Sequence, residues 1–202
     1  MPAPNNVYQK LIQELTGIVP SAALAPLLQF ITPVHLPPGA LYIKEGDTHK
    51  KIAFIEKGLL RTYFIKDNGD EATLFLRWEG HTIASHDTII YHRPSRFRYR
   101  ALEPTTVFEI DYAKLEELLK IYPGLEAVRS HFLLKMLADT LRLVETFVLL
   151  TPEGRYQELI NTRGTIVRRV PDKYIASILG VTPVSLSRIK KRMYNKGKRN
   201  PS

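Results

Sequence analysis

The residue types best suited to binding chemistry gather near the C-terminus, in the stretch IASILGVTPVSLSRIKKRM at residues 175–193. Its second half combines short hydroxyl side chains with a run of cations. Hydroxyl groups, Lys and Arg bind phosphate oxygens, and Arg can also bind the edge of guanine through two hydrogen bonds. These groups therefore suit a nucleic acid.

Apolar residues in the same stretch predict how these groups are held. Ala176, Gly180, Leu186 and Ile189 have the spacing of a helix-turn-helix. The small residue lets two helices approach closely, the glycine permits positive φ at the turn, and the aliphatic residues lock the second helix to the first. The Thr-Pro pair that follows suits the start of that second helix.

The second helix is expected to enter the major groove of DNA. Its N-terminal residues, Pro183 and Val184, would face base edges, and Arg188 would read a base, with guanine preferred. The remaining polar groups would mainly hold phosphates. The expected DNA-contacting residues are Thr182, Pro183, Val184, Ser185, Ser187, Arg188 and Lys191.

Charge is concentrated at the same end of the chain. Of the net charge of +9, residues 163–202 carry 11 basic groups and one acid, which leaves 18 basic and 19 acidic groups in the other 162 residues. Such clustering is typical of a polyanion-binding surface, because bound cations release counterions from phosphates. A solvated basic tail is the alternative interpretation.

Residues 32–110 have the texture of an antiparallel β domain. Turn signals recur every 8–12 residues and separate β-rich runs such as KIAFIE, LLRTYFI, ATLFLRW and RFRYRAL. Asn68-Gly69 predicts a hairpin between the second and third of these runs. Many short strands at regular spacing indicate a sandwich or barrel. Helices are predicted on either side, within residues 5–31 and from Asp111 to about residue 122.

A long helix is predicted for about 26 residues from Gly124 onward, because no Gly or Pro interrupts a broad apolar stripe. A stripe this long favours a dimer interface, and packing on the protein's own core is the alternative. Thr151-Pro152-Glu153 then begins another helix that ends near Gly164. The β-branched run TIVRRV after it is expected to form a short strand.

Two segments near the C-terminus read RYQELI and VPDKYIASILGVTPVSLSRIKK. Together they closely resemble the C-terminal domain of the CRP/FNR family of bacterial transcription regulators. The segment LPPGALYIKEGDTHKKIAFIEKGLLRTYFIKDNGDEATLFLRWEG resembles that family's cyclic-nucleotide-binding β-roll. The resemblance covers the whole chain. It implies an α+β fold: an antiparallel jelly-roll or β-roll domain at 1–122, a dimerisation helix at 123–150 and a winged-helix-like, helix-turn-helix domain at 151–202.

The chain departs from this family at both functional sites. Cyclic-nucleotide binders of the family carry a Gly-Glu pair and then Arg-Ser or Arg-Thr, whereas here His81-Thr82 follows Gly80, and Ser95-Arg96 stands in the reverse order. A shift of one residue on a strand turns a side chain to the other face, so cAMP or cGMP binding is not expected. Pro183 and Val184 replace the Arg-Glu pair of the cAMP receptor type. The operator sequence that those receptors bind therefore cannot be assigned to this chain. The family's wing, a hairpin that follows the second helix of the helix-turn-helix, is also cut short.

Other functions are less well supported by the sequence. The chain has no cysteine, which excludes disulfides, thiolate metal sites and a thiol nucleophile. His81, His86 and His92 lack the spacing of a metal site, and Arg96, Arg98 and Arg100 are interpreted as an exposed charged face rather than an anion pocket. We therefore expect no catalytic residue, metal or cofactor.

The expected protein is a cytoplasmic, homodimeric regulator that binds double-stranded DNA, since neither a signal peptide nor a membrane-spanning segment is recognised. A small-molecule effector is left open. The alternative is a ligand-binding or enzymatic β-barrel with a non-specific basic tail.

Overall fold

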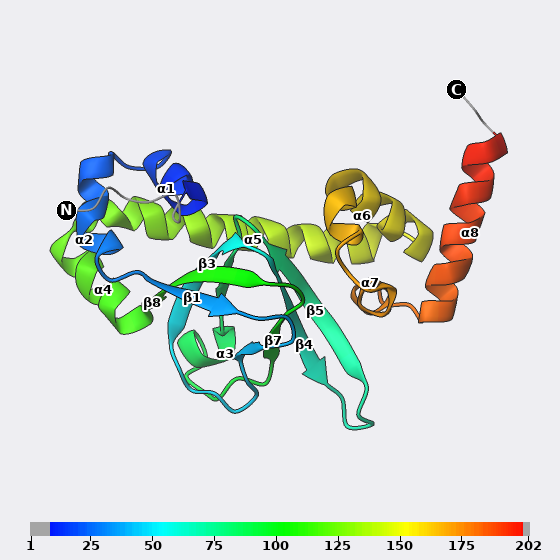
Figure 1. Ribbon diagram of the computed structural model, residues 1–202, viewed down its shortest axis with the longest axis horizontal. Helices are drawn as coiled ribbons and strands as arrows, with labels where there is room; N and C mark the ends of the chain where they lie inside the picture. Colours follow the sequence, from blue (N-terminus) through cyan, green and yellow to red (C-terminus); the bar gives the residue numbers. More distant parts are fainter. Residues whose placement is uncertain (1–8, 200–202) are drawn as a thin grey trace. The chain divides into compact units, whose positions relative to one another are not determined.

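The computed structural model describes residues 9–199, and the side chains of residues 9–195 (Figure 1). The chain divides into two compact units. The first comprises the chain up to Phe64 together with residues 75–138, and the second comprises residues 65–74 and the chain from Asp139 onward. Each unit is described by itself below.

Two short helical segments open the first unit. They are α1 (Gln9–Thr16), and the consecutive turns η2 (Ser21–Leu24) and α2 (Ala25–Leu28). Leu11, Leu15 and Leu27 are buried, so these helices form one wall of the unit's core. Within residues 9–199, no single helix is long and apolar enough to cross a membrane; the α1 segment and Ser21–Leu28 meet the length and composition criteria only as a pair bent by 117°.

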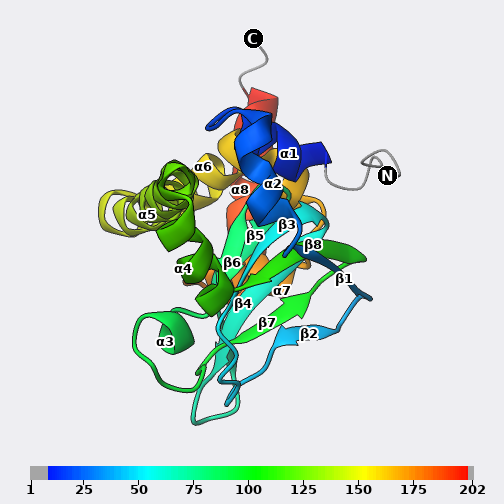
Figure 2. The ribbon, with the colours of Figure 1, turned by 90° about the vertical axis from the view of Figure 1, so that its left-hand side faces the viewer.

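Eight strands form two sheets of four, which Figure 2 shows as two layers. The first sheet has the order β1-β8-β3-β6 and the second β2-β7-β4-β5. The strands are β1 (Thr32–Leu36), β2 (Leu41–Ile43), β3 (Lys51–Lys57), β4 (Leu59–Ile65), β5 (Glu71–Trp78), β6 (Thr82–Ala84), β7 (Arg98–Ala101) and β8 (Thr105–Asp111). The pairings given in register are antiparallel, which confirms the predicted β-roll.

Side chains alternate between the two faces of each sheet, as strand geometry requires. Ile55 and Val107 of the first sheet meet Leu60 and Ala101 of the second in a closed interior cluster. The opposite face of the first sheet carries Phe54, Phe108 and Ile110, which pack under the helices. The Asn68-Gly69 hairpin between β4 and β5 forms as predicted, with Gly69 at φ 85°.

Helix α3 (His86–Ile89) lies between β6 and β7, and helix α4 (Tyr112–Ile121) follows β8. The turn η3 (Pro123–Leu125) then leads into α5 (Glu126–Leu149). Asp111 caps α4 as predicted, because its carboxylate accepts the N–H groups of Ala113 and Lys114. On α5 only Val128 is buried. A series of exposed apolar residues follows it: Leu133, Leu134, Leu137, Leu141, Val144, Phe147, Val148 and Leu149.

The second unit contains α6 (Pro152–Val167), α7 (Asp172–Ile178) and α8 (Pro183–Arg199). The predicted strand TIVRRV is wrong. The helix bends at Arg163, where φ is −145°, and its continuation buries Ile166. Burial of this side chain in a helical turn overrides the β preference of its neighbours. Residues 139–199 contain no strand, so no wing hairpin follows α8 within the described residues.

Gly58 lies at a close approach of two strands and allows a direct test of the roll. Its φ is 103°, and a β-carbon there would lie 2.6 Å from the Cα of Thr105 and 2.8 Å from the carbonyl oxygen of Pro104. Gly58→Ala is expected to lower the free energy of unfolding by more than about 3 kcal/mol, since backbone strain and overlap add. Gly39, at φ 85° with open space around it, provides the control. Gly39→Ala should cost only about 1–2 kcal/mol in urea denaturation, and equal losses for both variants would contradict this account.

Candidate functional site

Helices α7 and α8 pack on each other through the residues that the sequence identified. Ala176, Ile175 and Leu186 are fully buried, and Ile189 is nearly so. Because Ala176 has only a methyl side chain, α8 can approach α7 closely at this point. The predicted pairing of two helices is confirmed.

The turn between them is made at Gly180, which has φ 68°. The N–H of Val181 donates to the carbonyl of Ala176 at 3.0 Å and ends α7. Helix α8 begins when the N–H of Ser185 donates to the Thr182 hydroxyl at 3.1 Å. That hydroxyl in turn donates to the Ser185 hydroxyl at 3.0 Å. The chain is therefore broken at the glycine and does not form one continuous rod.

Most of the residues predicted to contact DNA are accessible on α8 and its cap. Thr182, Pro183, Val184, Ser187, Arg188 and Lys191 are exposed, and Ser185 is half-buried. Val184 is an aliphatic side chain with 62% of its surface exposed at the first turn. An apolar group in this position can contact a thymine methyl group.

Ion pairs distinguish two sets of cations on α8. Lys190 pairs with Asp172, and Arg192 pairs with Glu153 at 3.1 Å. Arg188 and Lys191 make no ion pair within the described residues. Two cations thus hold α8 to its neighbours while two others remain available to an external anion.

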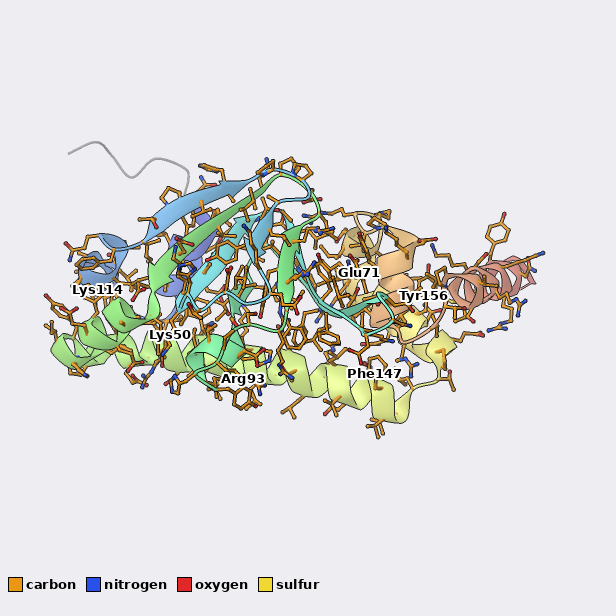
Figure 3. All side chains as sticks on the ribbon, turned by 90° about the horizontal axis from the view of Figure 1, so that it is seen from below. Lys50, Glu71, Arg93, Lys114, Phe147 and Tyr156 are labelled. Atoms are coloured by element: carbon orange, nitrogen blue, oxygen red, sulfur yellow. The ribbon has the colours of Figure 1, made fainter. Side chains whose placement is uncertain are left out.

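Arg155 of α6 fixes the end of α7, a role that the sequence did not reveal. Its Nε and Nη2 donate to the carbonyl of Leu179 at 3.1 and 3.0 Å, and its Nη1 donates to the carbonyl of Leu150 at 3.0 Å. The guanidinium also lies 4.5 Å from the ring centre of Phe147, which Figure 3 labels near the end of α5. A β-carbon at Gly180 would approach that ring to 3.1 Å.

The second contact that the sequence did not reveal joins α7 to the tip of the β4–β5 hairpin, which belongs to the same compact unit. The N–H of Thr73 on β5 donates to the Ser177 hydroxyl at 2.8 Å, and that hydroxyl lies 3.5 Å from the carbonyl of Glu71. The partners are 104 residues apart, so no local pattern reports the contact.

The segment that corresponds to the family's nucleotide cassette, residues 79–103, contains a buried carboxylate. Asp87 lies on α3, behind the N-cap Ser85, and is fully buried. It accepts a bond from the backbone N–H of Arg96 at 3.0 Å and from the Arg96 Nη2 at 3.1 Å. It also accepts from the Nε of Arg93 at 3.0 Å. Figure 3 labels Arg93 on the loop after α3. Arg96, the arginine of the Ser95-Arg96 pair, is therefore already paired within the chain.

Electrostatics favour this closed arrangement at neutral pH. Burial raises the pKa of Asp87, but the hydrogen bonds from Arg96 and Arg93 outweigh it and hold that pKa well below its usual range. Burial also lowers the pKa of the neighbouring His86, so its imidazole is neutral at pH 7. Ser95 is buried and its hydroxyl donates to the carbonyl of Phe97 at 2.9 Å. Ser95 therefore serves the loop itself.

The remaining candidate arginines do not line one anion pocket. Arg98 pairs with Glu45 at 3.0 Å, and Arg100 lies over the ring of Tyr63. Arg96 precedes β7, so the three arginines do not all lie on one strand. No group of three or more metal-ligating side chains occurs among the described residues.

Comparison with known proteins places this fold. Residues 33–122 match the family model of the cyclic nucleotide-binding domain. A curated relative, the mouse (Mus musculus) patatin-like phospholipase domain-containing protein 7, is 26% identical over 113 residues. That match covers 55% of this chain but 8% of the relative, so the chain corresponds to a small part of that protein.

Solved structures match nearly the whole chain. A mutant of CooA from Carboxydothermus hydrogenoformans superposes with a TM-score of 0.70, covering 92% of this chain and 85% of its own. A transcriptional regulator of the crp/fnr family from Eubacterium rectale gives 0.69, with 91% and 87% covered. The c-di-GMP-responsive global regulator CLP from Xanthomonas campestris gives 0.67, with 88% and 93% covered. Each is 16% identical to this chain, so the resemblance found in the sequence is confirmed as a common fold.

The buried carboxylate can be tested through acid stability. Asp87→Asn should lower the free energy of unfolding at pH 7 by about 2–3 kcal/mol, because two arginines lose their charged partner. Since the folded-state pKa is lowered from 3.8, the contribution is complete above about pH 5 and is lost as the pH falls through the folded value. The difference in the free energy of unfolding between wild type and variant, measured by urea titration, should therefore become smaller below about pH 4.

The exposed pair of Glu45 with Arg98 provides the control for this measurement. Glu45→Gln should change the free energy of unfolding by less than about 1 kcal/mol. A gap between wild type and Asp87→Asn that is constant from pH 7 to pH 2 would contradict the assignment.

Proposed function

We propose that this chain, which has the fold of the CRP/FNR regulators, is a cytoplasmic, homodimeric transcription factor that binds double-stranded DNA and does not respond to cAMP. Residues 1–122 form the sensor-like domain, 123–150 the dimerisation helix and 151–202 the DNA-binding domain. The observation that carries the proposal is the exposed, unpaired face of α8, with Arg188 and Lys191 on it.

The chemistry of that face suits a major groove. A helix that begins with Pro183 and Val184 can bring small side chains close to base edges, while Arg188, one turn further on, reaches a guanine. Thr182, Ser185, Ser187 and Lys191 are in position to hold phosphates. The surplus of positive charge beyond residue 163 supplies the sequence-independent attraction.

Dimerisation through α5 is supported by the exposed apolar residues on this helix. Leu134, Leu137, Leu141, Val144 and Val148 alternate at threes and fours, which is the seam of a two-helix coiled coil. A soluble monomer seldom exposes so long a row of large aliphatic side chains. A two-fold dimer would also present two copies of α8 to two half-sites of an operator.

The insensitivity to cAMP is supported by the cassette. Asp87 already neutralises Arg96, so a cyclic phosphate would have to displace a buried carboxylate that has several hydrogen bonds. The proposal includes no enzymatic activity. The phospholipase relative is matched over 8% of its length, so its activity is not carried over.

Arg188 and Lys191 should have different effects on DNA binding. For a site obtained by in vitro selection, Arg188→Ala should weaken binding by about 1–3 kcal/mol and relax preference at one base position. Lys191→Ala should weaken binding to every sequence alike and reduce the slope of log K against log salt by about one per chain. Gel shifts or fluorescence anisotropy over a salt series measure both effects.

The control for charge is Lys44→Ala, which removes an exposed cation from the β-roll. It should leave affinity and salt dependence unchanged. Binding of the wild type that is weak and independent of salt would refute the proposed function. An equal loss for Arg188→Ala on all sequences would refute base reading by Arg188.

Leu137→Glu should dissociate the dimer, because it places a charge in the apolar seam of α5. We expect the dimer dissociation constant to rise by at least about 100-fold, a change of about 2.7 kcal/mol, as measured by light scattering over a dilution series. Ile121→Glu replaces a residue of similar exposure on α4 and should leave the dimer intact. Dissociation by both variants, or by neither, would contradict an interface on α5.

A further inference from the structure

A cavity of about 350 Å³ lies within the first compact unit, between the first β-sheet and the helices that cover it. Its walls come from α1, α2, α3, α4, α5 and the strands β3, β6 and β8. The deep side is formed by Leu15, Phe54 and Phe108, which are buried. The rim is formed by Ile90 and Leu133, which are 64% and 56% exposed. The recess thus leads from solvent into the core.

The strand β6 separates this cavity from the interior of the roll. Ile83 points into the interior cluster, while its neighbours Thr82 and Ala84 line the cavity on the other face. The cavity is therefore distinct from that interior cluster. Its lining residues also do not include the cluster of Asp87 with Arg93 and Arg96. It has one element in common with that cluster, because His86 and Ile89 of α3 also line the cavity.

The charged and polar groups on the wall are satisfied or neutral. Arg129 pairs with Glu126 at 2.8 Å and with Glu116 at 2.9 Å. Burial lowers the pKa of His86, and burial together with a hydrogen bond to Glu116 raises the pKa of Tyr112, so both are uncharged at pH 7. A charged ligand would lose its hydration and find no unpaired counter-charge among these groups.

We propose that this cavity is a binding site for an uncharged, largely apolar small molecule. Its volume falls within the range of about 300–1,000 Å³ that is common for such sites, and its wall is apolar with a few polar groups at one side. A second copy of α5 packing on the exposed stripe would cover the rim at Leu133. It would not reach the deep wall at Leu15 and Phe108, so dimerisation would enclose a ligand and not replace it.

A molecule in this cavity would touch α3 and the part of α5 from Val128 to Met136 together. By contacting both elements, the ligand would bias the position of the dimerisation helix, provided that it binds more tightly to the protein with the helix in one position than in another. This regulatory role rests on the proposed DNA-binding function. The binding site itself does not, because it is argued from the cavity alone.

Titration of the full chain with the neutral fluorophore N-phenyl-1-naphthylamine tests the site. Fluorescence should rise saturably, with one molecule bound per chain. Filling the cavity by Ala84→Phe or, separately, by Met136→Trp should weaken binding by at least tenfold, with folding monitored by circular dichroism. Ile121→Glu changes an exposed residue of α4 that neither lines the cavity nor lies in the α5 seam, and it should alter affinity by less than twofold. Binding that survives both fillings, or that is lost in Ile121→Glu alone, overturns the site.

Competition defines the ligand class. 1-Decanol should displace the fluorophore at a concentration at least tenfold lower than decyl sulfate or decylammonium, because the wall offers no free charge. Equal displacement by a charged competitor overturns the assignment to an uncharged ligand.

The regulatory arm uses the selected DNA site. Saturating 1-decanol should change the affinity of the wild type for DNA by threefold or more and have no effect in Ala84→Phe. Arg188→Ala should still bind the fluorophore normally. Fluorophore binding without any DNA binding would refute the proposed function and leave the site standing. DNA binding that 1-decanol leaves unchanged would refute the regulatory role alone.

Discussion

The break in the chain at Gly180 is the constraint on which the proposed DNA-binding surface depends. Ala176 and Leu186 can be buried against each other only if α8 leaves α7 at a sharp angle, and this requires the positive φ of the glycine. Arg155 holds the preceding carbonyl of Leu179, and a β-carbon at Gly180 would make a tight contact of 3.1 Å with the ring of Phe147. The turn is therefore permitted by Gly180 itself and also held by the side chains of Arg155 and Phe147. Because α8 is held in this way, its exposed cations keep a defined orientation relative to α7.

In the segment at residues 79–103, a buried carboxylate of the chain itself pairs with the arginines. The carboxylate of Asp87 on α3 accepts hydrogen bonds from the guanidinium groups of Arg93 and Arg96, so the loop contains an internal anion beside these two arginines. The pair is partly exposed on the arginine side and buried on the aspartate side. Asp87 would thus remain as an unpaired buried charge if the arginines moved away, which is costly. This asymmetry keeps the loop closed and makes recruitment of another phosphate unfavourable.

Local patterns predicted the parts of the structure that local physics determines. The Asn68-Gly69 hairpin, the cap at Asp111 and the helix break at Gly180 each depend on residues within one turn of each other. The roles of Arg155 and Asp87 depend instead on loops that bring distant or irregular backbone together, and a single sequence carries no signal for those distances. The error at TIVRRV has a related cause, since burial of Ile166 in the continued helix decides against the β preference of the run. The DNA contacts of Arg188 and Lys191 stay predictions, whereas their exposure is observed.

The two faces of β6 differ in how they are packed. On the inner face, Ile83 and its neighbours close the roll, and at its end the Tyr99 hydroxyl donates to the carbonyl of Ala84. On the outer face, short side chains at Thr82 and Ala84 leave space that larger residues would fill. Core packing normally leaves few voids larger than a water molecule, because each missing contact costs dispersion energy. The proposed ligand would complete the packing of this recess, and it would contact both α3 and α5.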